Sequence, residues 1–216
     1  LMTSSNSITW SGTFTPNSNI EDTTNILTLS TAYTDAAGNS GPSSTTANYS
    51  IDTKAPTVIS FTMSDTSLKT GDTATVTLQF SEAVSGFNSN NDITAPNGTL
   101  STMTSSNNIT WTGTYIPTLD IEDASNVLIL GTGYKDVAGN DGVGNTTANF
   151  TIDTLPQAVS SFIMSEHSLN ATAPNNTATV TLVFSEPVSG FSSNDDITAQ
   201  SGTGTLALMA SDNNIT

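Results

Sequence analysis

The sequence predicts an all-β protein built from tandem two-sheet sandwiches of about 100 residues each. Two observations support this prediction. The chain repeats itself at a constant offset of 101 positions, from Met2/Met103 through Trp10/Trp111 to Asp52/Asp153, and self-similarity at a fixed period is the signature of repeat proteins. Short runs of apolar residues alternate with Thr and Ser between Gly, Asn and Pro, which is the period-two pattern of strands, and no helical period is present.

The offset divides the chain into three parts. Residues 1–52 correspond to the second part of one repeat, residues 53–153 form a complete repeat, and residues 154–216 begin a third. The third copy gains residues in the polar stretches 170–175 and 200–205, where a strand scaffold tolerates insertions. Leu1-Met2 also aligns with Leu208-Met209, so we expect the chain to be a window of a longer polypeptide.

In the complete repeat we expect seven strands in chain order, over residues 57–63, 73–80, 92–95, 99–104, 109–115, 127–130 with an extension toward 134, and 146–152. Seven short strands in about 100 residues, separated by turn residues, match an immunoglobulin-like sandwich. A domain of this size can bury an adequate core without disulfides, and the chain has no cysteine.

The alternation also predicts the side chains that face the core. They are Val58, Phe61, Ala74, Val76, Leu78, Phe80, Ile109, Trp111, Gly113, Tyr115, Ala148, Phe150 and Ile152. Trp10 and Trp111 lie on alternating strands, so we expect them to pack in a core and not to form a sugar-stacking platform. The exposed Thr rows raise the alternative of an ice- or glycan-binding face, but β-branched residues are usual on the solvent face of a sheet, and a twisted sandwich lacks a flat surface.

Charge restricts the possible partners. The chain has 19 acidic residues against three lysines, and its net charge is -16. Nucleic acid and anionic membranes require a basic surface, so neither is an expected partner, and no apolar run approaches the length of a membrane-spanning segment. Divalent cations are the partners that this charge attracts, and the simpler alternative is a solvated acidic surface.

One loop motif occurs twice. Tyr134-Lys135-Asp136-Val137-Ala138-Gly139-Asn140 repeats Tyr33-Thr34-Asp35-Ala36-Ala37-Gly38-Asn39. An aromatic residue ends a strand, an aspartate follows two residues later, and Gly-Asn supplies the positive φ angles of a tight loop. The loop therefore holds a carboxylate at a strand end.

Strand alternation predicts where the carboxylates gather. If the strands run up and down, the linker with Asp52, the loop with Glu82, and the loop with Asp136 and Asn140 lie at one end of the complete repeat. The preceding repeat presents Glu21 and Asp22 to the same joint from a loop at its far end. Ca²⁺ prefers six to eight oxygen ligands, and carboxylates from several loops can supply them. The sequence therefore predicts a calcium site at the joint.

The same set recurs at the next joint as Glu122, Asp123, Asp153 and Glu186, and Asp35 belongs to a further joint. A second interpretation remains open. Asp52 and Asp153 would cap turns before Pro56 and Pro156, and Asp136 would form an Asx-turn within its own loop.

Several motifs carry a family resemblance. Phe80-Ser81-Glu82-Ala83-Val84-Ser85-Gly86-Phe87, its counterpart at residues 184–191, the Asp-x-Ala-Gly-Asn loop and the Ile-Asp-Thr-x-x-Pro linker resemble the bacterial Ig-like repeats of giant secreted and cell-surface adhesins. The resemblance implies secreted or cell-surface arrays that act in adhesion and biofilm formation, often with calcium, with ligand-binding heads elsewhere in the polypeptide.

These observations favour a non-catalytic stalk, stiffened by Ca²⁺, whose partners are the neighbouring repeats of the same polypeptide. An enzyme is the first alternative, but His167 is the sole histidine, cysteine is absent, and no Gly-rich phosphate loop precedes a helix. The second alternative is a subunit of a self-assembling extracellular filament, in which residues 154–216 of one chain complete residues 1–52 of another.

Overall fold

A computed structural model describes residues 1–173, 176–200 and 203–211. The chain forms two units, Leu1–Thr154 and Leu155–Thr216. Nearly every element is a strand, which confirms the all-β prediction. Among the described residues no helix is long and apolar enough to cross a membrane.

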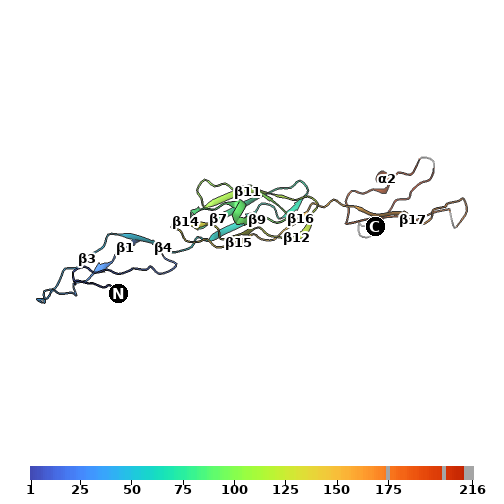
Figure 1. Ribbon diagram of the computed structural model, residues 1–216. Helices are drawn as coiled ribbons and strands as arrows, with labels where there is room; N and C mark the ends of the chain where they lie inside the picture. Colours follow the sequence, from blue (N-terminus) through green and yellow to red (C-terminus); the bar gives the residue numbers. More distant parts are fainter. Residues whose placement is uncertain (174–175, 201–202, 212–216) are drawn as a thin grey trace. The chain divides into compact units, whose positions relative to one another are not determined.

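A four-stranded antiparallel sheet forms the main layer of residues 53–153, in the order β10-β11-β7-β5. Its central strands β7 and β11 are labelled in Figure 1. Its strands are β5 (Val58–Met63), β7 (Ala74–Phe80), β10 (Gly98–Leu100) and β11 (Thr110–Pro117). β7 pairs with β5 on one side and with β11 on the other, so that Leu78 lies opposite Phe61 and Trp111. The two longest strands, β7 and β11, lie where the period-two alternation predicts them.

Shorter strands complete the repeat. They are β6 (Ser67–Lys69), β8 (Val84–Ser85), β9 (Ile93–Thr94), β12 (Glu122–Asn126), β13 (Ile129–Leu130), β14 (Lys135–Asp136), β15 (Asn145–Thr146) and β16 (Phe150–Asp153). They form the sheets β12-β16-β6, β15-β13-β9 and β14-β8. The pairing of β16 with β6 is parallel, and every other pairing of these strands is antiparallel.

The core of the repeat contains most of the predicted side chains of the main sheet and those of β16, while Val58, Ile109 and Gly113 are only partly buried. Ala74, Val76, Leu78, Phe80 and Tyr115 have no exposed surface, and Phe61, Phe150 and Ile152 are also buried. Trp111 packs against this core and is partly buried. Phe80, Phe87, Trp111 and Tyr134 form an aromatic cluster in which neighbouring ring centroids lie 4.7 to 6.3 Å apart.

Two expectations for this repeat are wrong in detail. Residues 89–92 form a one-turn helix, α1 (Ser89–Asp92), because the Asn88 side chain caps it, and strand β9 begins only at Ile93. Ala148 is exposed. Thr147 is buried in its place, because its hydroxyl accepts a hydrogen bond from the Leu128 amide at 3.0 Å.

Residues 1–52 contain β1 (Glu21–Asn25), β2 (Thr28–Leu29), β3 (Ser44–Thr45) and β4 (Tyr49–Asp52). They align with residues 102–153, so they include no counterparts of β5 and β7. Trp10 is 55% exposed, so the expectation that it packs in a core is wrong. The second unit contains β17 (Val159–Met164), β18 (Val180–Phe184) and α2 (Ser193–Asp196).

Candidate metal site

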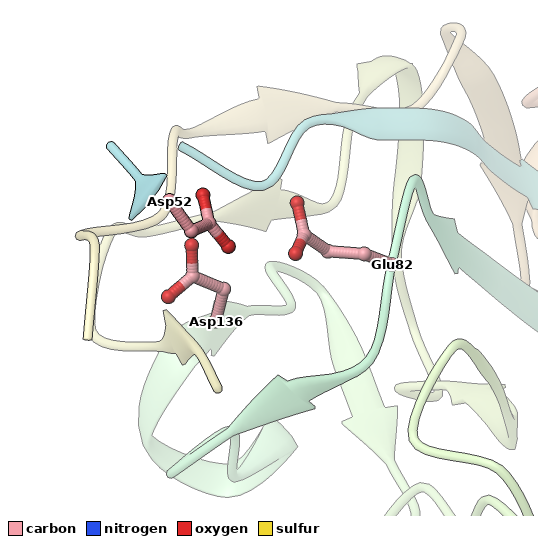
Figure 2. A group of neighbouring side chains, drawn as sticks. All are labelled: Asp52, Glu82 and Asp136. Carbon is pink, nitrogen blue, oxygen red and sulfur yellow. The ribbon is translucent and has the colours of Figure 1, made fainter. Parts of the chain in front are cut away.

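Three carboxylates from three separate segments meet at one end of the complete repeat. Asp52 is the last residue of β4, Glu82 follows the end of β7 by two residues, and Asp136 ends β14. One carboxylate oxygen from each of the three lies within 4.8 Å of the others. Figure 2 shows the three carboxylates turned toward a common space. In the described part of the chain, this is the one group of three or more acidic, His or Cys residues with such spacing.

Asp136 is fixed by its own loop. Its Oδ1 accepts hydrogen bonds from the backbone amides of Gly139 at 2.6 Å and Asn140 at 2.8 Å, and its Oδ2 accepts one from the Asn140 side chain at 2.7 Å. Only 1% of the residue is exposed. Burial alone would raise the pKa of Asp136, but the hydrogen bonds from Asn140 and Gly139 outweigh it and hold the pKa below its ordinary value. The buried group is therefore a carboxylate anion at neutral pH.

Asn140 connects this loop to the linker. Its side-chain nitrogen lies 3.4 Å from Asp52 Oδ1, 3.3 Å from the Asp52 carbonyl and 3.3 Å from the Lys54 carbonyl. Asp52 Oδ1 also accepts a hydrogen bond from the Lys54 backbone amide at 3.2 Å. Both local turn functions proposed from the sequence are thus present, and both leave carboxylate oxygens facing the cluster. Turn capping and cation binding are compatible at this joint.

Glu82 is the member of the cluster whose carboxylate has the fewest hydrogen bonds. None of the hydrogen bonds among the described residues uses its carboxylate. Partial burial, followed by repulsion from Asp136, Asp52 and Glu21, raises the pKa of Glu82, and Lys54 opposes this effect. A carboxylate held near other negative charges in this way gains most from a bound cation.

Glu21 and Lys54 lie beside the cluster. Glu21 is directly opposite Asp52 in the β1–β4 pair, and the Lys54 ammonium lies 3.0 Å from a Glu21 carboxylate oxygen. Sequence reasoning counted Lys54 only as part of the overall charge and did not assign it to the site. Its position two residues after Asp52 was the available signal. Four carboxylates against one ammonium (4 - 1 = 3) leave a local charge of -3 when all are ionised.

Asp22 and Asp123 lie on strands and each accepts a local hydrogen bond. We expected Glu21-Asp22 and Glu122-Asp123 in loops, but the structure places them on β1 and β12, next to bulges in the pairing with β4 and β16. Asp22 Oδ1 accepts from the Thr24 amide and Asp123 Oδ1 from the Ser125 amide, each at 2.9 Å. These two carboxylates hold the bulges in shape.

The remaining predicted ligands are not members of this group of three. Glu122 lies opposite Asp153 across β12 and β16. Glu186 follows β18 by two residues, as Glu82 follows β7. Asp35 is exposed, yet its oxygens accept from the Ala37 and Asn39 amides and from the Asn39 side chain at 2.9 Å each. Those bonds, chiefly from the Asn39 side chain, lower the pKa of Asp35, so the loop forms the same way in both copies.

The chemistry of the assembled site is that of a hard cation site. Its donors are carboxylate oxygens, and backbone carbonyls of the linker lie next to them. Nitrogen and sulfur ligands of the kind that select zinc are absent from the group, and a donor set of oxygen atoms is the one that hard divalent cations prefer.

Comparison with known proteins identifies the chain. The family model described as "Bacterial Ig-like domain" matches residues 1–51 and residues 52–152. No curated protein and no solved structure matches the chain. The matched segments cover well over half of the sequence and agree with the repeat offset and the sandwich of strands. The chain therefore belongs to the bacterial Ig-like domain family.

Proposed function

We propose that this chain is a non-catalytic structural segment of a bacterial surface adhesin, in which Ca²⁺ at the joint between repeats fixes their relative angle. Membership of the bacterial Ig-like family supports a structural role in a surface or extracellular protein. The observation that carries the calcium proposal is the convergence of Asp52, Glu82 and Asp136 from three segments that the cation would connect.

Repulsion between the carboxylates at the joint favours the binding of a cation. Asp52 ends β4 just before the linker, while Glu82 and Asp136 belong to the complete repeat. Without an ion the carboxylates repel each other, and the Lys54 charge offsets only part of that repulsion. A bound Ca²⁺ would attract all three groups, and the Asn140 amide could turn to offer its oxygen. Linker and repeat would then move as one body.

Calcium affinity sets the size of the effect. For an extracellular module with a dissociation constant of about 10⁻⁴ to 10⁻³ M, calcium at 100-fold excess stabilises the folded state by about 2.7 kcal/mol per site. At a few-fold excess the gain is below about 1 kcal/mol. The larger consequence is mechanical, because ligands on both sides of a linker limit its bending.

Isothermal titration calorimetry of the full chain with CaCl₂ tests the proposal. We expect one site with a sub-millimolar to millimolar dissociation constant, weakened at least about tenfold by Glu82→Gln, because this change removes a ligand charge without removing any hydrogen bond of the loop. The matched control is Glu186→Gln at the equivalent position of the next repeat, which should leave the titration unchanged.

Small-angle scattering provides the second measurement. At low protein concentration, calcium should increase the maximum dimension of the chain and EDTA should reverse the increase. A chain with no heat of calcium binding, or with the same scattering in EDTA and in millimolar calcium, would overturn the proposal.

A further inference from the structure

Asn97 and Gly98 form the turn that leads into β10, and each suits its position. Asn97 has a φ angle of 54°, in the left-handed region that Asn adopts more readily than most residues. A Cβ atom on Gly98 would lie 2.4 Å from the Tyr115 ring, whose hydroxyl donates a 2.7 Å hydrogen bond to the Pro96 carbonyl. The turn therefore favours Asn followed by Gly, and the sequence contains this dipeptide once.

The same pair of residues is chemically reactive, because a glycine without a Cβ leaves its backbone nitrogen unhindered. When the Gly98 nitrogen attacks Asn97 Cγ, a bond forms between these two atoms and the Cγ–Nδ2 bond breaks. The proton of the Gly98 N–H passes to water, and Nδ2 takes up a proton from water and leaves as ammonia. A second water molecule opens the cyclic imide at either carbonyl, and aspartate or isoaspartate remains at position 97.

The attacking nitrogen lies on an edge strand, since β10 is the outermost strand of the main sheet. The Thr118 amide donates to the Asn97 carbonyl at 2.9 Å, and Gly98 lies opposite Pro117. In an antiparallel ladder this makes Gly98 and Pro117 a non-hydrogen-bonded pair, so the Gly98 N–H points away from β11. The pairing with β11 therefore does not occupy the nitrogen.

The Asn97 side chain ties the turn to β12. Its Nδ2 donates to Asp123 Oδ2 at 2.9 Å and to Asn126 Oδ1 at 2.8 Å. Asn126 is 2% exposed, and its own Nδ2 donates to the Asp123 carbonyl at 3.0 Å. In the left-handed conformation of Asn97, the Gly98 nitrogen is turned away from the side chain. Closure of the imide therefore requires a backbone rotation that opens the turn and breaks both hydrogen bonds of Nδ2.

We propose that Asn97 is a deamidation site that the folded repeat protects and that opening of the β10 edge exposes. After the reaction a carboxylate replaces the donating amide and faces Asp123 Oδ2 and Asn126 Oδ1, which both need a donor. The two carboxylates repel each other, so the tie between the turn and β12 is lost. The modification records irreversibly that the repeat has opened. This inference goes beyond the proposed function and involves no cation.

Peptide mass spectrometry of the full chain tests the protection. Samples are kept in the same buffer with and without urea, and the fraction of Asn97 converted is followed over time. Conversion should be at least about tenfold faster in the unfolded chain, because a factor of ten requires an opening free energy of only about 1.4 kcal/mol. Equal rates in the two states, or no conversion in urea, would overturn the proposal.

Two substitutions distinguish opening of the turn from general unfolding. Asp123→Ala removes one acceptor of the Asn97 amide, and should accelerate conversion in the folded chain about tenfold, because a hydrogen bond to a charged group is stronger than a neutral one. Tyr134→Phe removes a different hydrogen bond, to the Val143 carbonyl, and should change the rate much less. Equal acceleration by variants of equal stability in urea unfolding would overturn the role of the β10 edge.

Asn97→Asp imitates one product of the reaction. It should lower the equilibrium constant for folding at least about tenfold, and Asp123→Asn in the same chain should restore most of the loss, because an amide again faces a carboxylate. Asn108→Asp is the matched control. Asn108 has a φ angle of 57° but is exposed, and its side chain makes no hydrogen bond within the described part of the chain. Equal effects at the two positions, or no restoration by Asp123→Asn, would also overturn the proposal.

Discussion

The Glu82→Gln substitution should change the stability of the complete repeat in opposite directions with and without calcium. In the absence of a cation, Glu82 is opposed by burial and by Asp136, Asp52 and Glu21. Two unit charges 4.8 Å apart, the upper distance within the cluster, repel by about 0.9 kcal/mol at the dielectric constant of water and about 3.5 kcal/mol at an effective value of 20. The charge of Lys54 and solvent screening offset part of this repulsion.

We therefore expect Glu82→Gln to raise the free energy of unfolding in EDTA by about 1 kcal/mol. With calcium at 100-fold excess over its dissociation constant, the parent chain gains about 2.7 kcal/mol and the variant loses most of that gain. The order of stabilities should then be reversed, with the variant more stable in EDTA and less stable in calcium.

Urea unfolding followed by Trp111 fluorescence measures this effect, in a Trp10→Phe background so that the signal comes from the complete repeat. Trp111 is a suitable probe because it packs edge-on against Phe87 within the core. Glu186→Gln is the control and should leave the Trp111 transition unchanged in both buffers. A variant that is less stable in EDTA, or that keeps the full calcium response, would refute the reasoning about the cluster.

Three further results are expected. Calcium affinity should weaken as pH falls from 7 toward 5, because burial and neighbouring carboxylates raise the pKa of Glu82 above 4.5 and the ion binds the charged form. In EDTA the free energy of unfolding should change in the opposite direction, because the stability contributed by protonated Glu82 is fully present below its unfolded pKa and is lost as pH rises through its folded pKa. Calorimetry and urea unfolding at several pH values measure the two trends. Tyr134→Phe should lower the free energy of unfolding in urea by about 1 kcal/mol, because it removes the 2.7 Å hydrogen bond from the Tyr134 hydroxyl to the Val143 carbonyl. Tyr33→Phe, at the exposed counterpart, should not change the stability of the complete repeat, and equal effects of the two substitutions would contradict the prediction. Leu78→Ala should cost about 2 to 5 kcal/mol because the side chain is fully buried, and Ile59→Ala, whose side chain is 62% exposed, should change the unfolding midpoint little.

The sequence was most informative where local pattern and tertiary role agree. β7 could be predicted residue by residue because apolar and polar side chains alternate along a strand that has one face on the core. The carboxylate cluster could also be anticipated, since alternating strand direction places the linker and two loops at the same end. The loop that carries Asp136 forms the same hydrogen bonds around the exposed Asp35, which shows that its short sequence specifies its shape.

Elements that depend on distant partners could not be predicted in this way. β12 has no apolar alternation, and its place is set by pairing with β16 and by the hydrogen bond between the side chains of Asn97 and Asn126 at 2.8 Å. The helix α1 is a polar run whose Ser89 accepts a hydrogen bond from the Met103 amide at 2.8 Å. The 55% exposure of Trp10 is likewise not revealed by its own alternating pattern.

The parallel pairing of β6 with β16 has a consequence for a chain under tension. β6 follows the strand by which the polypeptide enters the repeat, and β16 is the strand by which it leaves. Pulling the two ends apart draws β6 and β16 in opposite directions along their length. The paired residues Thr151/Ser67, Ile152/Leu68 and Asp153/Lys69 are then sheared together and are not peeled apart one after another. Force applied along the polypeptide therefore meets a group of bonds that must break simultaneously.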